Sequence, residues 1–66
     1  MTASRWSIRG VLRQTRGAMN ATARAGIKHR RNRNVVLRLE LIARHLRYAE
    51  EQLRFALRDA RERRTT

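Results

Sequence analysis

Hydrophobic positions in the second half of the chain recur at alternating steps of four and three residues. Such a heptad pattern is typical of a helix that lies along another helix. No proline or glycine interrupts it, because the chain has no proline and its last glycine is Gly26. The pattern predicts one long helix over residues 34–62, with heptad positions Val35, Leu39, Ile42, Leu46, Ala49, Leu53, Ala56 and Ala60.

A second apolar stripe follows the same predicted helix. Leu41, Tyr48 and Phe55 recur every seven residues on a flank of the heptad positions. A two-stranded coiled coil needs only a narrow apolar face, so this wider face favours a helical bundle or a helix packed into a larger assembly. We predict that protein contacts are made by Val35, Leu39, Ile42, Leu46, Tyr48, Leu53 and Phe55.

Polar residues support this helix at its start and along its outer side. Asn32 or Asn34 can cap its N-terminus. Acids also precede arginines by four residues, which is the orientation in which such pairs stabilise a helix. The predicted pairs are Glu40–Arg44, Glu50–Arg54 and Asp59–Arg63.

The first half of the chain has a weaker helical pattern over residues 4–25. Ser4 can cap its start, and Gly26 is a natural helix stop. A basic stripe runs beside a weaker apolar line, and their members are Arg5, Arg9, Arg13 and Arg16, and Ile8, Leu12, Thr15, Met19 and Thr22. We therefore predict an all-α fold of two helices, residues 4–25 and 34–62, joined by a basic turn as a hairpin or an extended pair.

Length and composition limit what the chain can do alone. Its 66 residues allow a single small helical unit, 1–66, and a domain of this size buries a marginal core. The chain has no cysteine for a disulfide, and its two histidines are not at metal-binding spacing. We expect oligomerisation or docking onto a larger assembly to complete the fold.

Charge is concentrated ahead of the long helix. Lysine and arginine number 17 against five acids, for a formal net charge of +12, and no acid precedes Glu40. Residues 1–33 thus form a basic, acid-free segment, and residues 34–66 form the heptad-patterned helix. All the basic residues except Lys28 are arginines, whose planar guanidinium suits bidentate contacts with phosphate. This split indicates one part that binds a polyanion and one part that packs.

The run Gly26–Asn34 is the densest basic segment. Arg30, Arg31 and Arg33 lie where the N-terminus of the long helix carries a partial positive charge, which is unfavourable unless an anion binds there. A solvated basic hinge is the alternative interpretation. Together with the arginine stripe, the run predicts phosphate contacts from Arg5, Arg9, Arg13, Arg16, Arg24, Lys28, Arg30, Arg31 and Arg33.

These patterns argue against an enzyme. The glycines form no nucleotide-binding loop, neither histidine has an orienting carboxylate at helical spacing, and no cofactor is predicted. We expect a protein that binds the phosphate backbone of nucleic acid, as a free regulator or a structural subunit of a ribonucleoprotein particle. RNA is favoured over DNA, because arginine-dense helices resemble arginine-rich RNA-binding segments. The expected location is the cytoplasm, the nucleoid or a ribonucleoprotein particle.

A structural subunit of a large protein complex is the second hypothesis. In this case the long helix docks on other subunits, and the basic half meets acidic protein or lipid. The first 25 residues also have the arginine-rich, acid-free composition of a mitochondrial targeting peptide, so this hypothesis includes the mitochondrial matrix. The sequence has no apolar run of 18 or more residues that would predict a transmembrane helix.

Overall fold

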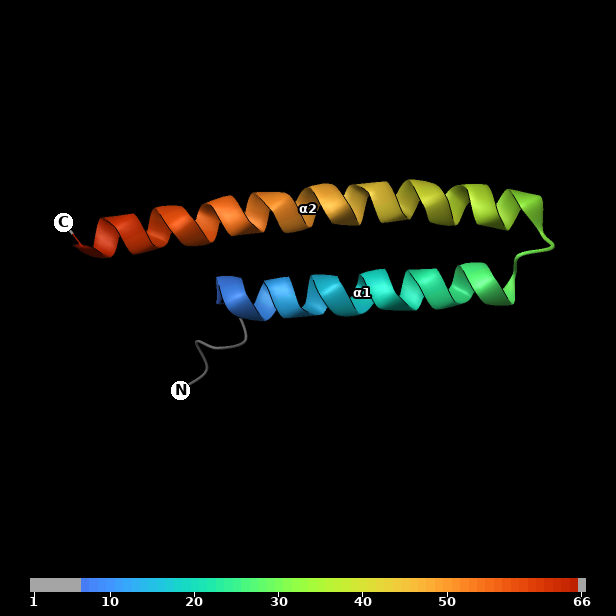
Figure 1. Cartoon of the computed structure of the whole chain (residues 1–66), viewed down its shortest axis with the longest axis horizontal. Helices are drawn as coiled ribbons and strands as arrows, with labels where there is room; N and C mark the ends of the chain where they lie inside the picture. The colour runs from blue at the N-terminus through green and yellow to red at the C-terminus, as the bar shows by residue number, and fades with distance from the viewer. Residues whose placement is uncertain (1–6, 66) are drawn as a thin grey trace.

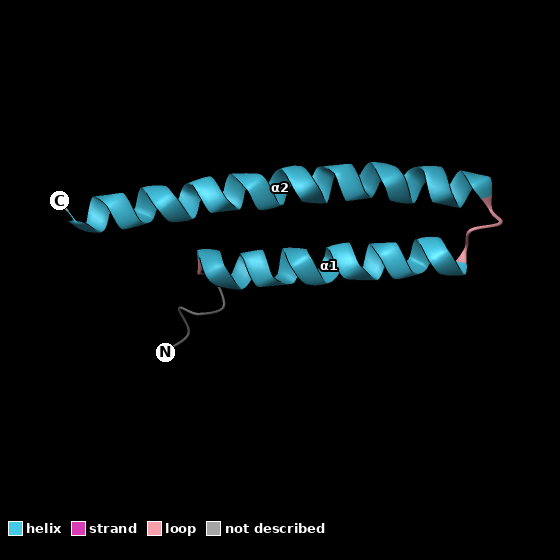
Figure 2. Cartoon of the chain, viewed as in Figure 1, coloured by secondary structure: helices cyan, strands magenta, loops and turns pink. Residues whose placement is uncertain are grey.

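The protein is a hairpin of two antiparallel helices (Figure 1). The computed structural model describes the backbone of residues 7–65 and the side chains of residues 7–62. Helix α1 spans Ile8–Lys28 and helix α2 spans Arg33–Thr65. Figure 2 shows that a short turn joins them and that α2 extends beyond the start of α1. The all-α prediction is confirmed, and of the two arrangements considered the hairpin is the one observed.

Helix α1 begins at Ile8, four residues later than predicted, because Ser7 is its N-cap. Ser7 has an extended backbone, with φ −71° and ψ 154°. Its Oγ accepts a hydrogen bond from the Gly10 N–H at 3.0 Å, which satisfies one of the donors left open at the helix start. Ser4, the predicted cap, lies outside the described residues.

The prediction that Gly26 ends the first helix is wrong. The helix continues through Gly26 to Lys28 and is capped by His29, whose N–H donates to the Ala25 carbonyl at 2.9 Å. The turn then closes when the Asn32 N–H donates to the His29 carbonyl at 2.9 Å. No described residue has a positive φ. The turn therefore needs no left-handed residue, and Gly26 remains helical.

Helix α2 begins at Arg33, and its N-cap is Asn32, which is one of the two predicted candidates. The Asn32 Oδ1 accepts from the Val35 N–H at 3.3 Å, and the Asn32 carbonyl accepts from the Val36 N–H at 3.0 Å. The helix runs for 33 residues without a break. It ends at Thr65, three residues beyond the predicted end.

The two helices meet along a narrow seam of half-buried residues. On α1 these residues are Ile8, Leu12, Thr15, Met19, Thr22 and Gly26; on α2 they are Val36, Leu39, Ala43, Leu46, Glu50, Leu53 and Leu57. Both sets alternate steps of four and three, the spacing of helices that pack along their length. None of the described side chains is fully buried, so the hairpin is held by this seam and not by a closed core.

The seam shares only part of the predicted protein-contact set. Leu39, Leu46 and Leu53 belong to it, and Val35 is half-buried at its edge. Ile42, Tyr48 and Phe55 are exposed. The face of α2 that packs on α1 is therefore rotated from the predicted heptad positions, and the rest of that predicted set remains available to a partner.

Two threonines lie in the seam without leaving an unpaired hydroxyl. The Thr15 hydroxyl donates to the Val11 carbonyl at 2.8 Å, and the Thr22 hydroxyl donates to the Ala18 carbonyl at 2.7 Å. Each bond runs four residues back along α1, so the polar atom is satisfied within its own helix. The remaining methyl groups contribute to the packing.

Candidate nucleic-acid interface

Four basic side chains lie on the part of α1 that does not pack on α2. At 3.6 residues per turn, Arg13, Arg24 and Lys28 lie on the side of α1 opposite the seam, and Arg9 lies on the flank of that side. All four are exposed. From Arg9 to Lys28 they extend along roughly 28 Å of helix at ~1.5 Å per residue. Predicted Arg5 lies outside the described residues.

The turn continues this surface. Arg30, Arg31 and Arg33 are exposed and follow directly on Lys28. A shallow concave surface at the turn is lined by Ile27, Lys28, His29, Arg30, Arg31 and Asn32. The first turn of α2 contains no acid that would offset the positive charge at this helix start. We call the exposed cations of α1 and the turn that form no ion pair with a described acid the basic surface: Arg9, Arg13, Arg24, Lys28, Arg30, Arg31 and Arg33.

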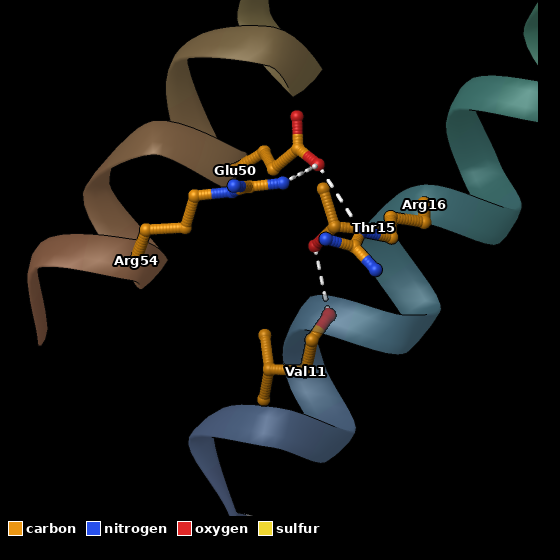
Figure 3. A network of polar contacts seen from close by, with 5 residues as sticks. All are labelled: Val11, Thr15, Arg16, Glu50 and Arg54. Carbon is orange, nitrogen blue, oxygen red and sulfur yellow. Dashed lines mark hydrogen bonds and ion pairs between the residues drawn. The ribbon is translucent and has the colours of Figure 1, made fainter. Parts of the chain in front are cut away.

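Arg16, one of the predicted phosphate contacts, forms an ion pair across the seam. Its Nε donates to Oε2 of Glu50 across the seam at 3.2 Å, and the Arg54 Nη2 donates to the same oxygen at 3.3 Å (Figure 3). The Glu50 side chain is only 19% exposed. Both ion pairs therefore converge on one partly covered carboxylate, and they leave Arg16 less available than its neighbours for an external phosphate.

The predicted ion pairs along α2 have different outcomes. Glu50–Arg54 is confirmed. Glu40 and Arg44 are both exposed and do not form the pair predicted for them, which is expected where solvent screens the attraction and long side chains lose entropy on pairing. The third pair involves Arg63, whose side chain lies outside the described set.

Glu50 is the carboxyl whose titration responds to this network. The hydrogen bond from Arg16 lowers its pKa below the ordinary value of 4.5; desolvation opposes this shift, and the bond from Arg54 adds to it. A carboxyl with a depressed pKa in the folded state stabilises the fold above its unfolded pKa, and this contribution is lost as the pH falls through the folded pKa. Glu50 therefore supports the hairpin at neutral pH and not in acid.

Glu50→Gln is expected to lower the melting temperature by a few degrees at neutral pH. The difference between wild type and variant should shrink as the pH is lowered from 7 to about 3, because Glu50 becomes protonated in the wild type. Thermal melts followed by circular dichroism across this range measure it. Glu40→Gln is the control, since Glu40 is exposed and forms no ion pair with the described side chains. A difference that stays constant with pH would contradict the role assigned to Glu50.

Sequence reasoning missed that Glu50 joins the two helices. It assigned Glu50 to the outer side of the helix, paired with Arg54 only. The sequence does contain a signal for this contact, because a single acid occupies a heptad position in an otherwise apolar stripe. That stripe consists of Val36, Leu39, Ala43, Leu46, Glu50, Leu53 and Leu57. An acid in that place needs a cation from the facing helix, and Arg16 provides it.

Comparisons with known proteins do not indicate a function for this chain. No family model matches the sequence, and neither a curated protein nor a solved structure matches it. Within the described residues, neither helix is both long enough and apolar enough to cross a membrane. The same residues contain no group of three or more His, Cys, Asp or Glu side chains that could hold a metal ion.

Proposed function

We propose that this chain is a nucleic-acid-binding protein that contacts the phosphate backbone through the basic surface. The observation that supports this most directly is the arrangement of its cations. Seven exposed lysine and arginine side chains follow the outer side of α1 and the turn, in a part of the chain that contains no acid. Such a surface repels itself in isolation, and a polyanion relieves that repulsion.

The chemistry of the cations favours phosphate as the group contacted. Six of the seven are arginines, which bind phosphate oxygens through two parallel N–H donors. They span several helical turns, so they can contact several phosphates along a backbone rather than enclose a single small anion. Backbone contacts of this kind position a protein on nucleic acid without selecting a sequence. We expect little sequence preference, and RNA as the preferred polymer.

The turn is the part of this surface where an anion is favoured most. Arg30 and Arg31 precede α2, and Arg33 is its first residue. The positive end of the helix and three arginines are therefore neighbours along the chain, and Arg30 and Arg31 line one shallow surface at the turn. A phosphate bound there would neutralise both.

Replacing Arg30, Arg31 and Arg33 together with alanine is expected to weaken binding to RNA and DNA at least tenfold. The slope of log affinity against log salt should also become shallower by about one unit for each phosphate that is no longer neutralised. Fluorescence anisotropy with labelled single-stranded and duplex oligonucleotides measures both quantities. Helix content should not change, because all three side chains are exposed.

The matched control removes the same charge from α2. Arg47, Arg58 and Arg61 are also exposed arginines, but they lie in the part of α2 after residue 39, which carries all five acids. The triple alanine variant at these positions should bind almost as the wild type does. An equal decrease of affinity in the two triple variants would show that net charge alone, and not the basic surface, determines affinity.

A further inference from the structure

Helix α2 carries an apolar stripe on the side that faces away from α1. Leu41, Tyr48 and Phe55 are 53%, 64% and 45% exposed. Each lies two positions from a seam residue on either side, and two residues of an α-helix turn through about 200°. The stripe is therefore opposite the seam, and α1 does not cover it.

We propose that a second copy of this chain packs on this stripe, with the two α2 helices antiparallel and centred on Tyr48. The stripe is symmetric about that residue, since Leu41 and Phe55 are each seven positions away from it. An antiparallel pair centred there places Tyr48 against its counterpart and Leu41 of each copy against Phe55 of the other. Such a self-complementary patch is what a two-fold interface requires.

Charge along α2 also fits an antiparallel copy. Residues 33–47 of α2 contain four arginines and one acid, whereas residues 48–65 contain five arginines and four acids. An antiparallel arrangement therefore sets the half of each helix that has one acid against the half of the other that has four. Beside the stripe, Arg44 lies four residues before Tyr48 and Glu51 three residues after it, so Arg44 of each copy approaches Glu51 of the other.

The same charges disfavour other uses of this face. Glu51 and Asp59 lie beside it together with Arg38, Arg44 and Arg58, so the stripe is less suited to nucleic acid than the acid-free basic surface. A parallel second copy would set like charges against each other. The cations of α1 stay distant from the other copy, because α1 packs on the side of α2 opposite the stripe.

The size of the interface predicts a weak to moderate dimer. Helix α2 is roughly 50 Å long and about 10 Å wide, so each copy offers on the order of 500 Å². Standard stable interfaces bury about 800 Å² per partner, so we expect a micromolar rather than a nanomolar dissociation constant. Association would also give the hairpin, which has no fully buried side chain among its described residues, a second packed face.

This inference does not rest on the proposed function, but the two together have a consequence. Each turn lies about 18 residues from Tyr48, so the two basic turns of a dimer would be roughly 50 Å apart at opposite ends. A polymer long enough to reach both would bind more tightly than a short one through effective concentration.

The test is the mass of the nuclease-treated chain in solution, measured by sedimentation equilibrium at about 50 µM, where a micromolar dimer is mostly associated. We expect twice the monomer mass of 7.8 kDa. Tyr48→Glu should weaken association at least tenfold and keep the helix content, because Tyr48 is exposed. Ile27→Glu introduces the same acid at another large exposed residue, 69% exposed on α1, and should not affect association. A monomeric wild type, or a Tyr48→Glu variant that dimerises normally, would overturn the proposal.

A charge exchange tests the antiparallel arrangement separately. Arg44→Glu and Glu51→Arg should each weaken self-association by roughly threefold to thirtyfold, since each variant sets like charges against each other twice. In a mixed dimer one copy is acidic at both positions and the other is basic at both, so both contacts again pair opposite charges. The mixture should therefore restore the wild-type affinity. Failure of the mixture to associate better than either variant alone would reject the arrangement, as would stable assembly only with a different protein.

Discussion

Leu46→Asp is expected to unfold the hairpin. Leu46 is a half-buried member of the seam near the middle of α2. Aspartate there removes an apolar side chain from the surface that packs the two helices together and puts an unpaired carboxylate in its place, at a cost of about 2–4 kcal/mol. A helical unit of this size has about 3–5 kcal/mol of stability at most. We therefore expect far-UV circular dichroism to lose most of its helical signal at 25 °C.

The control for this substitution is Leu37→Asp. Leu37 is 54% exposed and lies near the start of α2, where an acid interacts favourably with the helix end. The variant should remain helical, with a stability within about 0.5 kcal/mol of the wild type. If Leu46→Asp also kept its helical signal and melting temperature at low micromolar concentration, the seam described between α1 and α2 would be wrong.

The hydrophobic period was sufficient to predict the two helices and the packing of the second along another helix. The uninterrupted pattern after Gly26 fixed α2 to within one residue at its start, and Asn32 was recognisable as a cap. Leu39, Leu46 and Leu53, which were predicted to contact a protein partner, are half-buried against another helix. That helix is α1, so part of the predicted protein-contact set is used within the chain.

The period did not determine which face of α2 packs on α1. Apolar residues on α2 satisfy two heptad patterns that differ by one position, for example Val35 and Ile42 against Val36 and Ala43. A shift of one residue turns the helix by about 100°. The choice between them depends on the register with α1, which includes the Arg16–Glu50 bond between residues 34 positions apart. The local spacing of apolar residues does not reveal a contact between residues that are so far apart in the sequence.

The sequence was sufficient to predict the charge of the candidate site and the exposure of most of its residues, but not the ion pair that Arg16 forms. The acid-free first half of the chain indicated a surface of exposed cations, and seven of the nine predicted residues are exposed there, with no ion pair to a described acid. Arg16 differs because it faces the one acid in the seam. Arg5 lies outside the described residues. The binding of phosphate by these cations stays a prediction.

The affinity for nucleic acid is expected to fall by about three orders of magnitude between 50 and 200 mM salt. Each phosphate neutralised by a lysine or arginine releases condensed counterions, and six contacts on duplex DNA give a slope of about −5 in log affinity against log salt. The basic surface has seven cations, so about six simultaneous contacts is a reasonable number for a single copy. Single-stranded RNA should show a slope about a fifth to a quarter shallower.

Two comparisons make this salt dependence specific to phosphate. A peptide nucleic acid strand has the same bases and no phosphates, so it should bind at least about a hundredfold more weakly at low salt. Association between copies through Leu41, Tyr48 and Phe55 is mainly apolar, so it should change by less than about tenfold over the same range. If RNA and DNA fail to bind at 50 mM salt, or if binding persists unchanged at 200 mM, the basic surface does not act through phosphate contacts. A protein partner held by the apolar stripe would then be the better account of the chain.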